Sequence, residues 1–118
     1  MRIAVTGGNG DMGRNLIPYL LKQNHTVVSI DRALPTTYMH GVNFIVADVR
    51  DFGQLIASIR GCDALIHLAA IRAPVNHPDP VVYADNTISS YNALSAASAL
   101  GIKRVCMASS INAIGGAF

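Results

Sequence analysis

Near its start the chain has three glycines at a spacing that suits phosphate binding. The segment from Thr6 to Gly13 has the sequence Thr-Gly-Gly-Asn-Gly-Asp-Met-Gly, a GxxGxxG pattern. Between a strand and a helix, Gly7 would permit a tight turn, Gly10 would let the backbone approach a pyrophosphate, and Gly13 would let the helix pack closely on the sheet. Free N–H groups and the positive end of the helix dipole would then face the phosphates. The pattern therefore predicts a phosphate-binding loop.

Glycines at this place in a chain also occur in ordinary turns and in methyltransferases. Methyltransferases carry glycines after a first strand and an acid after a second. A P-loop is excluded, because no Gly-Lys-Ser or Gly-Lys-Thr follows the glycines. An ordinary turn and a methyltransferase site are therefore the alternatives to a dinucleotide loop.

An acidic residue follows the second predicted strand. Asp31 lies 24 residues after Gly7, where a carboxylate accepts hydrogen bonds from ribose hydroxyls and repels a 2′-phosphate. This favours NAD over NADP, although the adjacent Arg32 could meet a phosphate and soften the preference. An aspartate that merely begins a turn is the alternative.

Another acidic residue, Asp48, follows the third predicted strand, with Val49 next to it. The carboxylate of Asp48 could accept a hydrogen bond from an adenine amino group while the backbone of Val49 contacts the edge of the ring. A helix cap at Asp48 or at Asp51 explains the same residues equally well. The residues alone leave both interpretations open.

The histidines and cysteines show no metal-ligand pattern. His67 lies in an apolar strand and is expected to pack there without a catalytic role, and the other three histidines lie in predicted loops. Cys62 and Cys106 are far apart, with no CxxC spacing. Both lie in or beside predicted strands, so buried, reduced thiols are expected, and no metal site is predicted.

Short apolar runs alternate with helical segments, which is typical of βαβ units. Pro18 is expected to kink the first helix, Asp79 to cap the third helix and Gly101 to end it. We predict an α/β fold of Rossmann type, a doubly wound parallel sheet that is incomplete, with the ligand crevice at the carboxyl ends of its strands. The predicted strands cover residues 2–6, 26–30, 42–47, 62–68 and 103–108, and the predicted helices cover residues 11–23, 51–59 and 81–100, all in a single domain over residues 1–118.

Composition supports a sheet buried on both faces and argues against several partners. Hydrophobic residues make up 51% of the chain and charged residues 14%. The nine Lys and Arg residues are scattered, which does not favour nucleic-acid binding. No leader and no apolar run of about 18 to 20 residues is present, so we expect no membrane association and a cytoplasmic location.

In sequence order these features resemble the extended short-chain dehydrogenase/reductase superfamily, of the NAD-dependent epimerase/dehydratase type. The resemblance covers essentially all 118 residues. It depends on residues 6–13, Asp31, residues 47–49, residues 67–70, residues 78–86, residues 93–97 and residues 104–110 with Gly115.

The resemblance implies a role for each of these positions. Ser110 would be the catalytic residue that hydrogen-bonds the substrate oxygen where hydride leaves or arrives. Arg72 would be a further contact to the cofactor. The implied NAD-binding residues are Gly7, Gly10, Asp11, Met12 and Gly13 at the pyrophosphate, Asp31 and Arg32 at the ribose, Asp48 and Val49 at the adenine, the backbone of Leu68, Ala69 and Ala70, and Asn86 beside the site.

Two departures from the family pattern affect the implied activity. Ile114 stands where the family often has tyrosine. The acid/base pair Tyr-x-x-x-Lys is absent, because the residues four after Tyr19, Tyr38, Tyr83 and Tyr91 are Gln23, Val42, Thr87 and Ser95. Hydride transfer needs such a base near neutral pH. We therefore expect this chain to be the NAD-binding part of an oxidoreductase or epimerase/dehydratase, truncated and inactive alone. Its substrate would be a small molecule that the sequence does not identify. A non-catalytic NAD(P)-binding module or sensor is the alternative.

The predicted helix over residues 81–100 has two apolar faces. Val81, Ala84, Ile88, Tyr91 and Leu94 share one face, and Val82, Ala93, Ala96 and Leu100 share another. Packing on the sheet accounts for one face only. The resemblance implies a homodimer interface on this helix in a full-length form.

Overall fold

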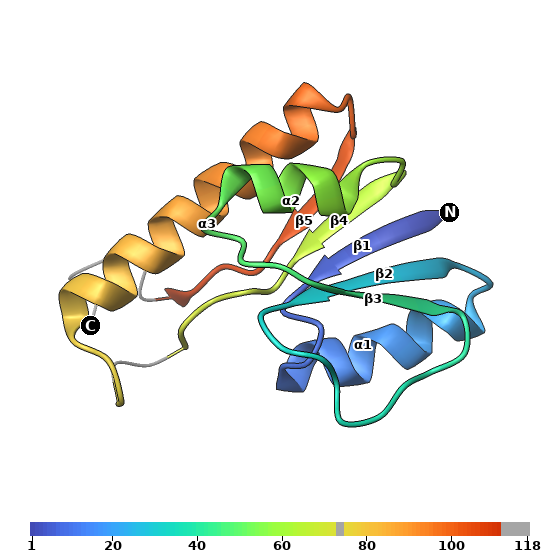
Figure 1. Cartoon of the computed structure of the whole chain (residues 1–118), viewed down its shortest axis with the longest axis horizontal. Helices are drawn as coiled ribbons and strands as arrows, with labels where there is room; N and C mark the ends of the chain where they lie inside the picture. Colours follow the sequence, from blue (N-terminus) through green and yellow to red (C-terminus); the bar gives the residue numbers. More distant parts are fainter. Residues whose placement is uncertain (73–74, 112–118) are drawn as a thin grey trace.

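A parallel sheet with the strand order β3-β2-β1-β4-β5 forms the centre of the chain (Figure 1). The computed structural model describes residues 1–72 and 75–111. Within them the strands are β1 (Arg2–Thr6), β2 (Thr26–Asp31), β3 (Val42–Val46), β4 (Ala64–His67) and β5 (Arg104–Met107), and the helices are α1 (Asp11–Lys22), α2 (Phe52–Ile59) and α3 (Asp79–Ala99). The predicted Rossmann-type fold and all eight predicted elements are confirmed, with boundaries within two residues.

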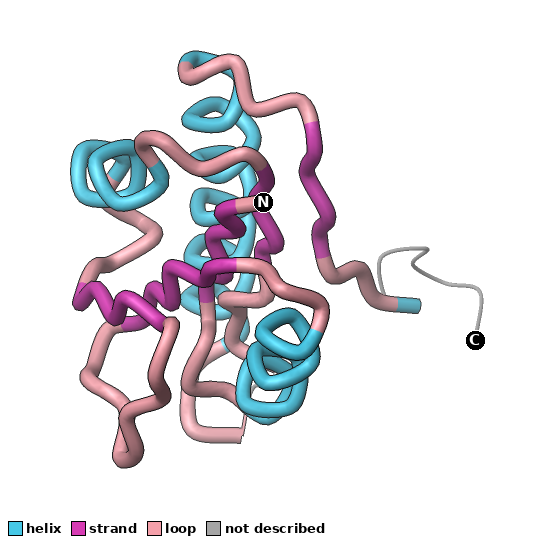
Figure 2. Tube along the Cα trace, turned by 90° about the vertical axis from the view of Figure 1, so that its right-hand side faces the viewer, coloured by secondary structure: helices cyan, strands magenta, loops and turns pink. Residues whose placement is uncertain are grey.

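Helices cover both faces of this sheet. Figure 2 shows α1 and α2 end-on, on opposite sides of the strands. Side chains of β1 alternate between the two layers, with Ile3 and Val5 in the cluster that contains Ile17 of α1, and Ala4 in the cluster of α2 and α3. This alternation follows from the period of two residues in a strand, and it explains why the central strands are mostly apolar.

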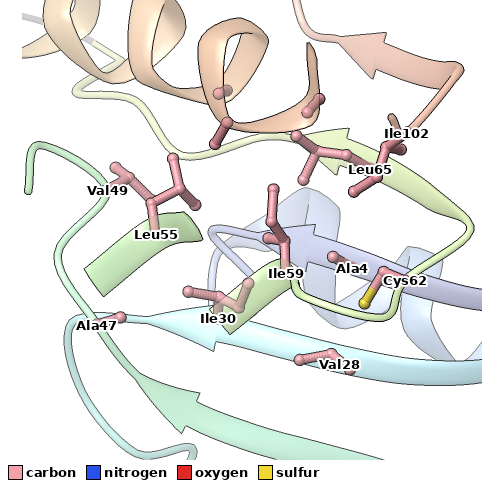
Figure 3. Packing of buried hydrophobic residues seen from close by; sticks show 13 residues of the cluster. Ala4, Val28, Ile30, Ala47, Val49, Leu55, Ile59, Cys62, Leu65 and Ile102 are labelled. Carbon is pink, nitrogen blue, oxygen red and sulfur yellow. The ribbon is translucent and has the colours of Figure 1, made fainter. Parts of the chain in front are cut away.

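The larger core lies between the sheet and helices α2 and α3 (Figure 3). Leu55 and Ile59, one helical turn apart on α2, are fully buried with Ile30 of β2 and Leu65 of β4. Burial of each such side chain contributes about 1.5–3 kcal/mol. This core fixes α2 and α3 against the strand ends that surround the site.

Helix boundaries follow the predicted signals, with one correction. Asp51 caps α2 by accepting a hydrogen bond from the N–H of Gln54 at 3.0 Å. Gly101 follows α3 with φ +70°, the left-handed conformation expected of a glycine that ends a helix. The prediction that Asp79 caps α3 is wrong: Pro78 is the N-cap and Asp79 is already helical. Its carboxylate instead lies in the first turn, where the helix dipole favours it.

Pro18 lies inside α1, which runs as one helix from Asp11 to Lys22. Because proline has no N–H, the carbonyl of Arg14 lacks its helical partner. Arg14 is exposed, so water can hydrate that carbonyl. The helix therefore continues through Pro18, and a bend in its axis there remains a prediction.

One of the two cysteines does not lie where the sequence predicted. Cys62 is buried, but Cys106 is exposed, so the prediction of two buried thiols is wrong for Cys106. Cys106 pairs in register with Ile66 of β4, which packs in the cluster on the α1 side of the sheet. Because β5 is an edge strand and α1 packs on β1 and β2, no described residue covers that side of β5 at Cys106.

No helix among the described residues has both the length and the apolar character needed to cross a membrane.

Candidate functional site

The glycine loop between β1 and α1 is folded tightly against two neighbouring strands. Gly7 has φ +70°, and its N–H donates to the carbonyl of Ile30 at 2.8 Å. A Cβ atom on Gly7 would lie 2.8 Å from the backbone nitrogen of Ala69. Gly10 is the N-cap of α1, and no side chain caps that helix. The first turn of α1 is therefore open to an anion, as a phosphate-binding loop requires.

Gly13 has a different neighbour from the one that the pattern predicted. A Cβ atom at this position would lie 2.5 Å from the carbonyl oxygen of Gly8 and 2.6 Å from that of Gly7. The close approach is thus between the helix and its own glycine loop. Gly13 therefore packs against the glycine loop and is not among the residues that line the crevice.

A crevice of about 260 Å³ opens at the carboxyl ends of β1, β2, β3 and β4. It joins twelve of the thirteen predicted NAD-binding residues, all except Gly13, and it also contains Arg72. Its lining residues are Gly7, Gly10, Asp11, Met12, Ile30, Asp31, Arg32, Ala47, Asp48, Val49, Arg50, Leu68, Ala69, Ala70, Ile71, Arg72, Asp85, Asn86 and Ser89. Segments distant in the sequence therefore form one concave site.

Asp31 presents its carboxylate at this crevice on two backbone hydrogen bonds. The N–H of Asn9 donates to Oδ2 at 3.0 Å, and the N–H of Arg32 donates to Oδ1 at 2.7 Å. The Asn9 side chain donates in turn to the carbonyl of Ala33 at 2.6 Å. The carboxylate is therefore positioned by both the glycine loop and the end of β2. Its remaining lone pairs can accept hydrogen bonds from ribose hydroxyls.

The backbone after β4 is held by two polar side chains. Thr6 Oγ1 accepts hydrogen bonds from the N–H of Leu68 at 3.2 Å and from that of Ala69 at 3.4 Å. Asn86 of α3 accepts from the N–H of Ile71 at 2.8 Å and donates to the carbonyl of the same residue at 2.9 Å. These contacts position the backbone that lines one wall of the crevice.

The opposite wall contains an ion pair between neighbours in the sequence. Arg50 donates to Asp48 through Nη2 at 2.6 Å and through Nε at 3.0 Å, and its Nη1 donates to Asp85 at 2.9 Å. The hydrogen bonds from Arg50 lower the pKa of the Asp48 carboxyl to about 2. Asp48 is thus ionised across the physiological range. It does not cap α2, which is the role of Asp51.

Asp11 lies at the positive end of α1 between two arginines. Arg14 donates to Oδ1 at 2.6 Å, and Arg72 from the loop after β4 donates to Oδ2 at 2.7 Å. These hydrogen bonds, that of Arg14 first, lower the pKa of Asp11. Because both arginines neutralise the carboxylate, it repels a nearby phosphate less than a lone aspartate would.

Some predicted positions lie outside this crevice. Ser110 follows β5 and is exposed, and it does not line the crevice. Ile114 and Gly115 lie outside the described residues.

Sequence reasoning also missed part of the site. Arg50 and Asp85 line the crevice although neither was selected from the sequence. Their positions, two residues after Asp48 and directly before Asn86, were the available signal.

Comparisons with known proteins agree with this architecture. The NAD dependent epimerase/dehydratase family matches residues 3–117. A dTDP-6-deoxy-L-talose 4-dehydrogenase (NAD(+)) from Aggregatibacter actinomycetemcomitans is 30% identical over 119 residues, which cover 98% of this chain and 43% of that protein. The chain spans between 12% and 43% of the length of the curated relatives that it matches.

Solved structures show the same fold. A UDP-galactose 4-epimerase superimposes with a TM-score of 0.86 at 29% identity, over 99% of this chain and 41% of that one. A variant of uronate dehydrogenase from Agrobacterium tumefaciens, in complex with NAD, superimposes with a TM-score of 0.80 at 29% identity, over 92% of this chain and 40% of that one.

Proposed function

The chain belongs to the NAD-dependent epimerase/dehydratase family, and from this we propose that residues 1–118 are the NAD-binding domain, without its carboxyl-terminal side, of an enzyme that transfers hydride at a substrate hydroxyl or carbonyl. One observation carries the proposal. A single crevice contains the glycine loop, the Asp31 carboxylate, Asp48 and the backbone after β4. NAD, the cofactor, supplies the hydride acceptor when bound.

The glycine loop would hold the pyrophosphate. Gly10, Asp11 and Met12 line the crevice at the start of α1, and that helix has no side-chain cap. Backbone N–H groups of this turn can donate to phosphate oxygens, and the helix dipole favours the negative charge. A side chain at Gly7 would collide with the backbone of Ala69, so glycine fits here.

Asp31 and Asp48 would hold the adenosine end. The carboxylate of Asp31 can accept from both ribose hydroxyls and disfavours a 2′-phosphate, which favours NAD over NADP. Arg32 also lines the crevice, so some NADP binding is expected. Asp48 would accept from the adenine amino group while the Val49 backbone contacts the ring.

The nicotinamide end would lie along the wall after β4. The backbone of Leu68, Ala69 and Ala70 lines the crevice there, supported by Thr6 and Asn86. Ser110, which follows β5, would hydrogen-bond the reacting oxygen of the substrate. It orients that oxygen but is a weak base at neutral pH, so the proton must be taken by another group.

The usual base of this family is not among these residues, because no tyrosine is followed by lysine at the fourth position. We expect the 118 residues to bind NAD without turnover, with the base supplied from outside them. The same observation favours a second candidate, a non-catalytic NAD-binding module or sensor. A cytoplasmic location, a small-molecule substrate and no nucleic-acid partner belong to the proposal as expected from the sequence.

A homodimer through α3 is also proposed. The face that contains Ala93 and Ala96 is buried against the core, whereas Tyr83 and Tyr91 on the outer side are 75% and 65% exposed. Ile88 and Leu94 are exposed beside them at 41% and 51%. The proposal concerns the full-length protein, whose sedimentation at micromolar concentration tests it, and a monomer would contradict it.

Titration of the chain with NAD and NADP by calorimetry tests the function. Preferential NAD binding that weakens in Asp31→Ala supports the dinucleotide site. A folded chain, by circular dichroism, that binds neither dinucleotide overturns it. Turnover of a substrate by the protein separates the enzyme from the sensor.

A further inference from the structure

The side chain of Arg50 connects the end of β3 to helix α3. Its Nη1 donates to Oδ2 of Asp85 at 2.9 Å, and its Nη2 donates to Oδ2 of Asp48 at 2.6 Å. The Nε–H is shared between both oxygens of Asp48, at 3.0 and 3.1 Å, and the Arg50 backbone N–H donates to Oδ1 at 2.9 Å. The guanidinium is thereby fixed at both ends.

These contacts leave the Asp48 carboxylate one acceptor position. Three hydrogens of Arg50 point at it: the backbone N–H, the shared Nε–H and one from Nη2. An ionised carboxylate offers about four lone-pair positions. Asp48 lines the crevice, so a bound ligand can donate one further hydrogen bond to it.

The backbone under this carboxylate is held independently. The N–H of Asp48 donates to the side-chain oxygen of Gln54 at 2.9 Å. The buried amide of Asn92 donates to the carbonyls of Val49 and Arg50, at 3.1 and 2.9 Å. Removal of the Arg50 side chain therefore leaves the backbone of residues 48–50 in place. It releases two carboxylates, that of Asp85 and that of Asp48, which keeps only the hydrogen bond from the backbone N–H of residue 50.

We propose that Arg50 is a positioning residue that sets the purine specificity of the dinucleotide site, by fixing Asp48 with a single acceptor position directed to a ring amino group. This rests on the proposed binding of NAD. A 6-amino group, as in adenine, can donate to that oxygen. The 6-carbonyl oxygen of hypoxanthine would instead face the Asp48 carboxylate oxygen, so two acceptors would meet and the hypoxanthine dinucleotide would bind more weakly.

The test compares the dissociation constants of NAD and nicotinamide hypoxanthine dinucleotide, measured by calorimetry. The parent chain is expected to prefer NAD by about ten-fold or more, the range of a hydrogen bond to a charged group. In Arg50→Met the ratio is expected to fall to within about three-fold of unity, because the carboxylate keeps only the hydrogen bond from the backbone N–H of residue 50 and can turn about it. Arg60→Met, an exposed arginine outside the crevice, is the matched control and keeps the parent ratio.

Asp48→Asn gives an independent readout if Arg50→Met does not fold. Both Asp48 oxygens accept from Arg50, so the amide nitrogen of asparagine meets an Arg50 donor in either orientation, and the preference for NAD is expected to fall toward unity. Retention of the parent ratio in folded Arg50→Met, or of the NAD preference in Asp48→Asn, overturns the positioning role. A parent chain that binds both dinucleotides equally overturns this inference alone, whereas a folded parent that binds neither overturns the proposed function as well.

Discussion

Thr6 Oγ1 lies 2.7 Å from Nδ1 of His67, its neighbour on the adjacent parallel strand. The same hydroxyl oxygen accepts from the N–H groups of Leu68 and Ala69. Because those groups can only donate, the Thr6 hydroxyl is free to give its own hydrogen to His67. The hydroxyl therefore links His67, at the centre of the sheet, to the backbone that forms one wall of the cofactor crevice.

Replacement of Thr6 by valine is expected to destabilise the chain by about 1–3 kcal/mol, because buried donors and an imidazole nitrogen lose their partner. NAD should also bind more weakly, since the backbone of Leu68 and Ala69 loses its support. Urea unfolding and calorimetry measure the two effects. Thr6→Ser restores the hydroxyl and should recover most of both, and a valine variant with parent affinity for NAD would contradict the link.

Acid is expected to destabilise the fold through His67. Burial lowers the pKa of this imidazole below its usual 6.5, and its side chain is only 3% exposed. The unfolded chain therefore binds a proton more readily, so this contribution to stability is complete above about pH 6.5 and decreases as the pH falls below it.

Urea unfolding at several pH values between about pH 5 and pH 8 measures this dependence. His67→Asn should flatten the decrease, whereas the exposed His77→Asn serves as the control and should leave it unchanged. An equal decrease in the His67 variant would assign the acid sensitivity to other groups.

Asp31 and Arg32 are expected to act in opposite directions on cofactor choice. Asp31→Ala removes the acceptor for the ribose and the repulsion of a 2′-phosphate, so the preference for NAD over NADP should fall by about ten-fold or more. Parallel titrations with NAD and NADP measure the ratio. Arg32→Ala in the same background should weaken NADP selectively, and equal weakening of both dinucleotides would argue against a phosphate contact.

Alanine at Gly13 is expected to deform the glycine loop. Its Cβ atom would lie 2.5 Å from the carbonyl oxygen of Gly8, so helix and loop must separate. Overpacking of this kind costs about 1–3 kcal/mol, and NAD affinity should fall with it.

Gly53→Ala provides the contrast, because a Cβ atom on Gly53, in the first turn of α2, would lie 3.3 Å from a side-chain atom, Oδ1 of Asp51, and not against backbone. There the gain in helix propensity, about 0.5–1 kcal/mol, is offset by the displacement of the Asp51 cap, so the free energy of unfolding should change by less than about 1 kcal/mol. Thermal unfolding and NAD titration of both variants compare the two positions, and equal behaviour would contradict the packing argument.

The strand and helix order could be predicted because local and global signals agree. Apolar runs, the glycines before α1 and Gly101 after α3 all point to the same elements. Cys106 could not be placed, because its exposure depends on β5 being an edge strand, which is a property of topology and not of local pattern.

Lining residues of the crevice could be selected from the sequence where a residue type at a fixed spacing is sufficient to indicate the role, as at Gly7 and Asp31. Arg50 was missed, because its contact with Asp85 joins residues 35 apart in the sequence. Pairing across such a distance is decided by the packing of α3 against the loop that follows β3. The sequence alone does not specify that approach.

Adjacent residues of α3 reach opposite walls of the crevice, Asp85 through Arg50 and Asn86 through Ile71. A rigid helix therefore forms a mechanical connection between the two walls, and a shift along its axis displaces both together. Cooperativity between the two halves of a dinucleotide is therefore expected, since occupation of one half would reduce the freedom that the other half must still restrict.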